Sequence, residues 1–414
     1  MKEIIEAMEY YAKIHRVPIM EQDGITFVKE YIKEHQCKTI LEIGSAIGYS
    51  AIQMASVDEE IQVITLEKDE ERYLRAIDNV LACKLQDRVT VILMDALEYE
   101  PQQSFDLIFI DAAKAKYQRF FDHFHGYLHA NGTILTDNMN FHGLVADPSS
   151  VQNRSTRKML ERLQEYHTFL FQHRWFDTTL VQIGDGIAIS KRKPLLVDGV
   201  IFDMDGLMID SERMFLQKSR EWNKDGLLVN LDTFMNRAIG RNSRLIASMF
   251  VEEYGTAIPY HEFDEAVGAL VRQEFQKSGV PHKPGLLVLL KLLKKAGLKL
   301  AVATSTSRSL ALEHLTMAGI IEYFDVIITG DMVANSKPHP EIFLTAAKAL
   351  GIEPGRTLVL EDSNSGVQGA ISGGFGVMMI VDILPPANEN KEQLMAIGFS
   401  LHEVIPFIEQ SIGA

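Results

Sequence analysis

Cysteine is scarce in this sequence, because its 414 residues include only Cys37 and Cys83. Two cysteines cannot form the dense disulfide framework of small secreted proteins, and they suit a reducing compartment. Long apolar runs are also missing, since none approaches the roughly 18 residues of a membrane span. The segment Met1–Arg16 alternates charged and apolar residues and lacks the apolar core of a signal peptide. These absences predict a soluble, cytoplasmic protein with no membrane partner.

An excess of basic residues is missing as well. The formal net charge is −15. Residues 1–192 contain 21 lysines and arginines against 29 acids, which leaves 20 against 27 for the remainder. This balance disfavours bulk electrostatic binding of nucleic acid, although a local basic patch remains compatible with a specific RNA.

Strand-like and helix-like segments alternate along the chain, which is typical of βαβ units around a parallel sheet. Apolar strands are expected at residues 39–43, 62–66, 89–93, 107–110 and 133–136. A second series of strands begins near residue 195, and a helical stretch at about 211–281 interrupts it. We therefore predict the α/β class, with two doubly wound sheet domains at 1–192 and 195–414 and a helical cap inserted in the second. The charged segment Asn388–Gln393 is expected to be a loop.

A glycine turn follows the first expected strand. The segment Leu41–Ser50 leaves this strand, turns through two glycines and enters a helix. Glycine lets the backbone approach a ligand, and a helix N-terminus attracts negative groups, but such a turn alone fits tight packing equally well. Glu67, about 20 residues further on, is placed to bind a ribose diol, and Asp95-Ala96, after the third strand, can border the adenine. The candidate nucleotide-binding residues are Glu42, Gly44, Gly48, Ser50, Glu67, Asp95 and Ala96.

Oxygen-bearing side chains follow two later strands. Asp111 ends one strand, and Asp137 and Asn138 end the next. Ligands of parallel sheets bind at the carboxyl ends of the strands, so these side chains offer three oxygen ligands to a hard cation such as Mg²⁺. A divalent cation can activate and orient a hydroxyl for methyl transfer. Lys114 is a candidate proton acceptor, although its spacing fits an ordinary surface lysine equally well.

On these motifs, residues 1–192 resemble the cation-dependent O-methyltransferases, which include catechol and caffeoyl-CoA enzymes. The resemblance implies that S-adenosylmethionine is bound by the glycine-turn residues and Asp111. It also implies that Mg²⁺ is held by Asp111, Asp137 and Asn138, with Lys114 as the catalytic lysine. Segments 137–145, 153–158 and 183–188 are most similar to the bacterial branch that methylates 5-hydroxyuridine at the wobble position of tRNA.

This branch implies tRNA as a partner. Four basic residues at the start of an expected helix are candidate phosphate contacts, namely Arg154, Arg157, Lys158 and Arg162. One polar helix face explains them equally well. A small phenol or catechol is the competing methyl acceptor.

A pair of aspartates ends the first strand of the second domain. Asp203 and Asp205 lie two residues apart, so one carboxylate can attack phosphorus while the other transfers a proton. Three later segments supply partners. Thr304 can bind phosphate oxygens, Lys337 can steady the phosphate and the nucleophile, and the acids Glu361 and Asp362 can hold Mg²⁺.

In order and context these segments resemble the haloacid dehalogenase superfamily, and most closely its β-phosphoglucomutase-like phosphatases. The resemblance implies Asp203 as nucleophile, Asp205 as acid/base, and Thr304 and Lys337 as phosphate contacts. The implied metal site combines Asp203, the Asp205 carbonyl, Glu361 and Asp362, and the substrate is a small phosphorylated metabolite.

Two segments of the expected cap bear on specificity. Residues 240–244 occupy the place where this family sets specificity, although an exposed helix–helix turn explains them equally well. Phe215 stands where the mutases of the family have a histidine, which favours a phosphatase over a mutase. Other readings are a ligand-binding protein and a single pathway enzyme whose domains act in sequence. The sequence leaves the oligomeric state open, a homodimer included.

Overall fold

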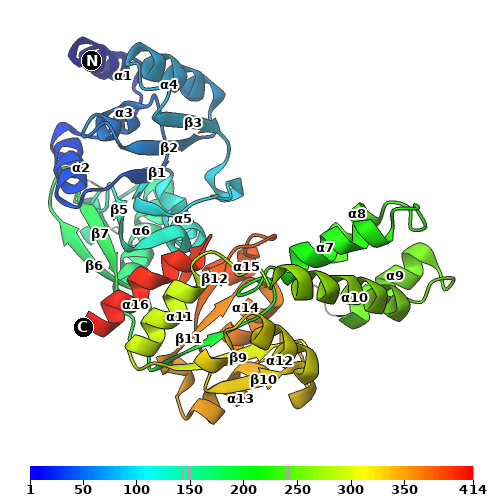
Figure 1. The fold of residues 1–414 in the computed structure, drawn as a ribbon. Coiled ribbons are helices and arrows are strands. Elements are labelled where there is room, and N and C mark those ends of the chain that lie inside the picture. Colours follow the sequence, from blue (N-terminus) through cyan, green and yellow to red (C-terminus); the bar gives the residue numbers. More distant parts are fainter. Residues whose placement is uncertain (142, 148, 150, 239–242, 414) are drawn as a thin grey trace. The chain divides into compact units, whose positions relative to one another are not determined.

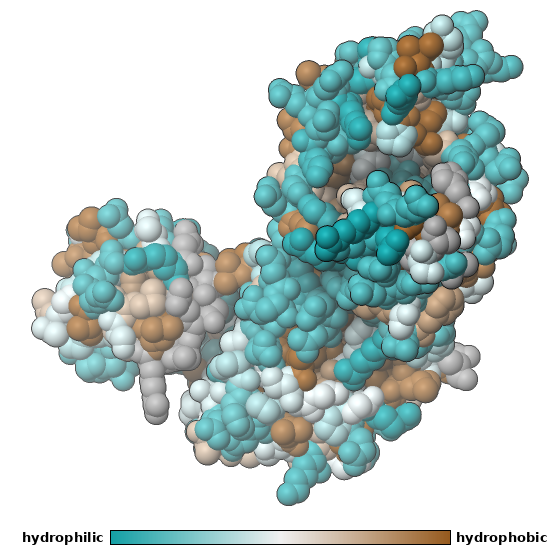
Figure 2. Space-filling view, turned by 180° about the vertical axis from the view of Figure 1, so that it is seen from behind, coloured by the Kyte–Doolittle hydropathy of each residue, from teal (hydrophilic) through white to brown (hydrophobic). Residues whose placement is uncertain are grey.

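The computed structural model describes residues 1–141, 143–147, 149, 151–238 and 243–413, and the chain divides into two units, Met1–Lys193 and Pro194–Ala414 (Figure 1). Each unit contains one mostly parallel sheet with helices around it, as the predicted α/β class requires. None of the described helices is both long and apolar enough to cross a membrane. Polar and apolar residues are interspersed on the face of the molecule that Figure 2 shows.

The sheet of the first unit has seven strands in the order β3-β2-β1-β4-β5-β7-β6. β7 runs antiparallel to β5 and β6, whereas the other neighbours are parallel. The strands are β1 (Thr39–Ile43), β2 (Gln62–Glu67), β3 (Val89–Leu93), β4 (Phe105–Ile110), β5 (Leu128–Thr136), β6 (Phe176–Val181) and β7 (Ile187–Arg192). The helices are α1 (Lys2–His15), α2 (Gln22–Glu34), α3 (Tyr49–Ala55), α4 (Glu70–Ala82), α5 (Tyr117–Phe124) and α6 (Arg154–Gln172).

The strand register of this sheet places three chain segments at one edge. Ile43 is level with Ile110, and Ile110 is level with Thr136, so β1, β4 and β5 end side by side. β1 lies where the strand order reverses, between β2 and β4. Such a reversal opens a crevice at the carboxyl ends of the strands, which is the usual ligand site of an open α/β sheet.

The sheet of the second unit is parallel throughout, in the order β10-β9-β8-β11-β12-β13. Its strands are β8 (Gly199–Phe202), β9 (Lys299–Thr304), β10 (Val326–Thr329), β11 (Thr357–Glu361), β12 (Gly376–Ile380) and β13 (Ala396–Gly398). The surrounding helices are α11 (Leu286–Lys295), α12 (Arg308–Met317), α13 (Glu341–Leu350), α14 (Asn364–Ser372), α15 (Asn388–Lys391) and α16 (Val404–Gly413). The expected loop at 388–393 was wrong in part, because its first four residues form α15.

Four of the five helices described between β8 and β9 form the cap, and the fifth, α11, belongs to the sheet domain. The cap helices are α7 (Ser211–Trp222), α8 (Leu231–Ala238), α9 (Ser243–Tyr254) and α10 (Tyr260–Ser278). The cap has its own apolar core, which includes Phe234, Phe250 and Phe263. Two chain crossings join the cap to the sheet, one at residues 208–210 and one at 281–283. They are hydrogen-bonded to each other: the Asp210 amide donates to the Pro281 carbonyl (3.1 Å), and the Lys283 amide donates to the Met208 carbonyl (2.9 Å).

Candidate functional sites

The glycine turn after β1 is built by close backbone packing. Gly44 has φ of +105°, and a Cβ atom there would lie 2.1 Å from the carbonyl oxygen of Asp111. Gly48 has φ of +80° and precedes α3, where a Cβ atom would lie 3.3 Å from that of Ala76. The first glycine therefore lets the turn lie against the end of β4, and the second lets α3 begin close to α4.

A buried polar network lies beneath this turn. The Glu42 carboxylate accepts hydrogen bonds from the Ser50 and Thr65 hydroxyl groups. Burial raises the pKa of Glu42 to about 7. Ser50 and Glu42 thus hold the turn and the start of α3 together. Their expected contribution to binding of the methyl donor is therefore to maintain the shape of the turn.

The next two acids are also held by the protein. Glu67 accepts hydrogen bonds from the backbone amides of Ala46, Lys68 and Asp69, each at 2.9 Å. This joins the end of β2 to the glycine turn. Asp95, next to the buried Ala96, accepts from the Leu97 amide (3.1 Å) and pairs with Lys116 (3.0 Å). These bonds place both carboxylates at the strand ends, beside the turn and the loop after β4.

We expect Gly44→Ala to destabilise the first unit by about 2–4 kcal/mol, because it combines a left-handed backbone with a clash against a carbonyl group. Gly143→Ala is the matched control, since Gly143 has φ of +80° but no atom of the described residues within 4 Å of the new methyl group. That control should cost only about 1 kcal/mol. Calorimetric unfolding of the full chain measures both, and equal losses would contradict the close approach of Gly44 to β4.

Asp111 and Asp137 meet at the edge where β4 and β5 end. The Asp111 amide donates to the Ile43 carbonyl and the Asp137 amide to the Ile110 carbonyl, both at 3.1 Å. Burial raises the pKa of Asp111, and burial followed by the Asp111 carboxylate raises that of Asp137 to about 7. Among the described residues, the Asp111 carboxylate has no hydrogen-bond or ion-pair partner. Two crowded acids of this kind fit a divalent cation, which would offset their charge.

Asn138 and Lys114 complete this cluster. Asn138 follows Asp137 with φ of +57°, and its amide oxygen accepts a hydrogen bond from the Lys114 ammonium at 2.5 Å. The structure therefore brings all three expected metal ligands and the expected catalytic lysine together, with the Asn138 oxygen occupied by Lys114. The loop that follows is tied to α6, because His167 bonds to the Met139 carbonyl at 2.9 Å.

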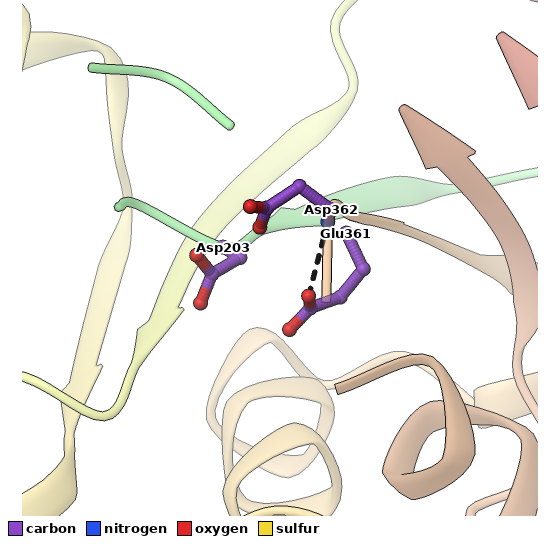
Figure 3. A group of neighbouring side chains, drawn as sticks. All are labelled: Asp203, Glu361 and Asp362. Atoms are coloured by element: carbon purple, nitrogen blue, oxygen red, sulfur yellow. Dashed lines mark hydrogen bonds between the residues drawn. The ribbon is translucent and has the colours of Figure 1, made fainter. Parts of the chain in front are cut away.

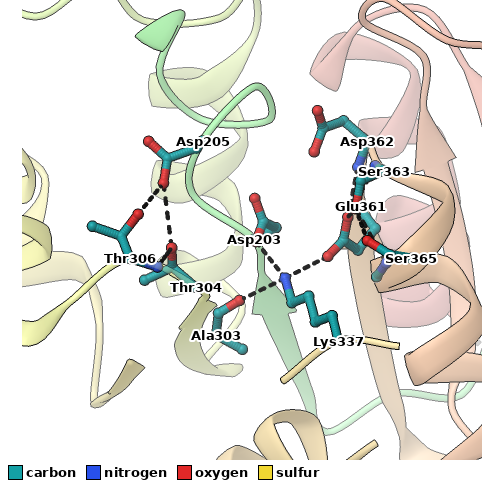
Figure 4. Close-up of polar contacts among 11 residues, drawn as sticks. Asp203, Asp205, Ala303, Thr304, Thr306, Lys337, Glu361, Asp362, Ser363 and Ser365 are labelled. Carbon is teal, nitrogen blue, oxygen red and sulfur yellow. Dashed lines mark hydrogen bonds and ion pairs between the residues drawn. The ribbon is translucent and has the colours of Figure 1, made fainter. Parts of the chain in front are cut away.

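In the second unit, Lys337 lies between two acids (Figure 4). Its ammonium donates to Asp203 and Glu361, each at 2.5 Å, and to the Ala303 carbonyl at 3.1 Å. Burial alone would lower the pKa of Lys337, but Asp203 and Glu361 raise it above its ordinary value. Burial raises the pKa of Asp203 to about 8, although Lys337 opposes this shift. Lys337 thus orients the expected nucleophile.

Asp205 is turned toward a different set of partners. Its carboxylate accepts from Ser211 (2.7 Å), Thr306 (2.7 Å) and Thr304 (3.3 Å). Figure 4 shows Asp205 beside the two threonines and apart from Lys337. Each of the three hydroxyl groups donates to one of the two Asp205 carboxylate oxygens. Asp205 is therefore positioned for proton transfer, apart from the Asp203 nucleophile and Lys337. Thr306 and Ser211 lie in segments that the sequence had indicated, but their hydrogen bonds to Asp205 were not predicted.

Asp203, Glu361 and Asp362 offer carboxylate oxygens that all lie within 4.8 Å of one another (Figure 3). Glu361 is already occupied, since it accepts from Lys337 and from the amides of Asp362 and Ser363. Asp362 has no side-chain partner among the described residues, and burial raises its pKa well above the usual range. When all three acids are ionised, the Lys337 ammonium leaves two negative charges unbalanced, which fits a divalent cation held by Asp203 and Asp362.

A second acidic group was missed by sequence reasoning. Glu212 of α7 and Asp382, which follows β12, lie with Asp362 so that one oxygen of each is within 4.8 Å of the others. Burial, then Asp205 and Asp382, raises the pKa of Glu212 to about 7. Asp382 lies far from the other motifs in the chain, so no local pattern reveals it. The specificity loop predicted at 240–244 is only partly covered by the structure. Residues 240–242 of this loop, and the side chains of 243 and 244, lie outside the described part of the chain.

Comparison with protein families assigns both units. Residues 1–193 match the family model described as O-methyltransferase, and residues 200–380 match that of the haloacid dehalogenase-like hydrolases. The chain belongs to both families. It is an enzyme that joins an O-methyltransferase unit to a haloacid dehalogenase-type phosphatase unit, which confirms the predicted family and enzyme classes. S-adenosylmethionine and Mg²⁺ are the usual cofactors of these families.

Individual relatives match one unit each. The phosphatase unit is 32% identical over 205 residues to the phosphorylated carbohydrates phosphatase of Thermotoga maritima, covering 50% of this chain and 94% of the relative. It is 30% identical to the validoxylamine A 7′-phosphate phosphatase of Streptomyces hygroscopicus, covering 42% and 81%. The methyltransferase unit is 35% identical to a solved Staphylococcus aureus protein provisionally assigned as a caffeoyl-CoA O-methyltransferase, covering 46% and 92% with a TM-score of 0.45.

Proposed function

We propose that the methyltransferase unit carries out Mg²⁺-dependent methyl transfer from S-adenosylmethionine to 5-hydroxyuridine in tRNA, giving 5-methoxyuridine. The observation that carries the metal dependence is the meeting of Asp111, Asp137, Asn138 and Lys114 at one sheet edge, beside the glycine turn. The acceptor oxygen attacks the methyl carbon as the carbon–sulfur bond breaks, and Lys114, acting as a neutral amine, takes the hydroxyl proton. A divalent cation held by the three oxygen ligands supplies Lewis acidity when bound.

The tRNA acceptor is supported by an exposed basic stripe on α6. Arg154, Lys158 and Arg162 are exposed and four residues apart, so they lie along one side of the helix. The same helix holds the loop after Asn138 through His167. Arg157 does not belong to the stripe, because its guanidinium group donates to the Val151 carbonyl at 2.7 and 3.0 Å.

We expect the triple change Arg154→Gln, Lys158→Gln, Arg162→Gln to weaken tRNA use and its salt dependence. Each phosphate contact contributes about 0.7–0.9 to the slope of log affinity against log salt concentration, so the slope should fall by about 2–3. Methyl transfer at several salt concentrations measures this. Lys2→Gln, Lys13→Gln, Lys84→Gln is the charge-matched control on exposed residues elsewhere in the unit. An unchanged slope in the α6 variant would remove the stripe from the tRNA site.

For the second unit we propose hydrolysis of a small phosphate ester through an aspartyl phosphate. An Asp203 carboxylate oxygen attacks phosphorus, the ester phosphorus–oxygen bond breaks, and Asp205 gives its proton to the leaving oxygen. Asp205 then takes a proton from water, which attacks phosphorus and releases inorganic phosphate and free Asp203. Lys337 steadies Asp203, and a cation held at Asp203 and Asp362 offsets the charge of the phosphate when bound. The name of the Thermotoga maritima relative favours a phosphorylated carbohydrate.

Water is the proposed acceptor because Phe215 is an apolar, partly buried ring that packs against the cap core. Its ring packs edge-on against Phe263 with centroids 6.3 Å apart, and it cannot shuttle a proton to a sugar hydroxyl. We expect a panel of sugar phosphates and nucleoside monophosphates to release inorganic phosphate. Interconversion of β-glucose 1-phosphate and glucose 6-phosphate without net phosphate release would show a mutase instead.

A further inference from the structure

Glu212 places a cap carboxylate among core carboxylates. It is the second residue of α7, and its carboxylate oxygen lies within 4.8 Å of oxygens of Asp362 and Asp382. Among the described residues, neither Glu212 nor Asp362 has a side-chain hydrogen bond or ion pair. Asp362 is only 8% exposed. A buried carboxylate without a partner is costly, so this arrangement lacks a compensating positive charge.

The nearby basic residues are already paired. Lys283 contacts Asp382 at 2.7 Å and Asp210 at 3.0 Å, and Arg213 contacts Asp382 at 2.8 Å. Asp210, Glu212 and Asp382 against these two bases add one negative charge to the two already counted around Asp203, Glu361 and Asp362. With all of these acids ionised, the surroundings of the site therefore carry three excess negative charges, and a divalent cation would offset two of them.

We infer that Glu212 is a positioning residue that ties the cap to the cation held by Asp203 and Asp362. This inference rests on the phosphatase function and metal site proposed above. Mg²⁺ keeps several water ligands in most protein sites, and a carboxylate a few ångströms away can accept a hydrogen bond from one of them. Glu361 cannot play this part, because its oxygens are taken by Lys337 and by backbone amides.

The consequence for the cap follows from the position of Glu212. It lies in the first turn of α7, directly after the chain crossing at Asp210. That crossing is hydrogen-bonded to the return crossing near Pro281 and Lys283, and Asp382 of the sheet domain pairs with Lys283 and Arg213. Holding Glu212 to the cation therefore fixes both chain crossings between the cap and the sheet. Cation binding thus holds the cap in one position over the site.

The test measures cation binding apart from catalysis. In the full chain carrying Asp137→Ala, which removes a ligand of the methyltransferase site, free Mn²⁺ is titrated by electron paramagnetic resonance. Glu212→Gln should raise the Kd for Mn²⁺ about tenfold, the effect expected for a group that acts through a metal ligand. Glu212→Ala should do the same. Glu221→Gln is the matched control on α7, because Glu221 pairs with Lys218 away from the cluster. The Kd of this variant for Mn²⁺ should stay within twofold of the parent value.

Hydrogen exchange gives a second readout. Mg²⁺ should slow exchange in the first turn of α7 in the Asp137→Ala chain, and this protection should vanish with Glu212→Gln. Suppose that Asp362→Asn abolishes Mn²⁺ binding but both Glu212 variants keep a Kd for Mn²⁺ within twofold of the parent, or keep full protection from hydrogen exchange. Either result for the Glu212 variants would overturn the inference. If Asp362→Asn also binds Mn²⁺ like the parent, the proposed phosphatase metal site itself fails, and the role of Glu212 fails with it.

Discussion

Asp203→Asn is expected to lower phosphate release by roughly 10⁴-fold or more, because the amide cannot form the acyl phosphate on which the reaction depends. Methyl transfer by the same protein should be unchanged. The measurement is release of inorganic phosphate from the best ester of the panel, alongside transfer of labelled methyl groups.

A charge-matched control separates loss of the nucleophile from loss of structure. Asp232→Asn removes an exposed cap acid that pairs with Arg220 at 2.7 Å and lies outside the site. It should retain full phosphatase activity. Asp203→Asn also leaves the buried Lys337 with Glu361 as its remaining acid, so its unfolding temperature is measured as well. A folded Asp203→Asn protein with a tenth of the parent activity would rule out Asp203 as the nucleophile.

Asp137→Ala, or exhaustive chelation of the parent protein, is expected to lower methyl transfer by at least about 100-fold. Binding of S-adenosylmethionine should persist, because the turn at Gly44 and Gly48 does not depend on the Asp137 side chain. Calorimetric titration with the methyl donor and transfer of labelled methyl groups measure the two effects separately.

The energetics of this variant differ from those of an ordinary buried substitution. Asp137 and Asp111 repel each other in the absence of a cation, so removing one carboxylate relieves that cost and the variant should fold. Mg²⁺ should restore activity to the chelated parent but not to Asp137→Ala. Full methyl transfer after exhaustive chelation would disprove the metal assignment.

Segments with one dominant pattern were predicted well. The predicted bounds of β1 and β3 agree with the structure, because apolar strands buried in a parallel sheet have a distinct pattern. β5 starts at Leu128, five residues before the predicted strand. The prediction began too late because His129, Asn131 and Gly132 interrupt the apolar run of this strand. α5 was not predicted, because its buried face consists of aromatic residues, which are weak helix formers.

The candidate sites show the same division. Acids at strand ends could be identified, because the parallel sheet itself brings Asp111 to Asp137 and Asp203 to Glu361. The proximity of Glu212 to Asp382 depends on how the cap meets the sheet, and 170 residues separate the two. The inward turn of Arg157 is likewise set by a carbonyl group of the preceding loop. Such contacts arise from tertiary packing, which residue spacing does not encode.

Mass spectrometry of tRNA nucleosides tests the proposed methyl acceptor most directly. The full chain is incubated with tRNA that contains 5-hydroxyuridine, Mg²⁺ and S-adenosylmethionine labelled on its methyl group. The account predicts labelled 5-methoxyuridine, which is absent with Asp137→Ala and present with Asp203→Asn. Efficient labelling of small catechols, with hydroxylated tRNA left unmodified by the same preparation, would contradict it.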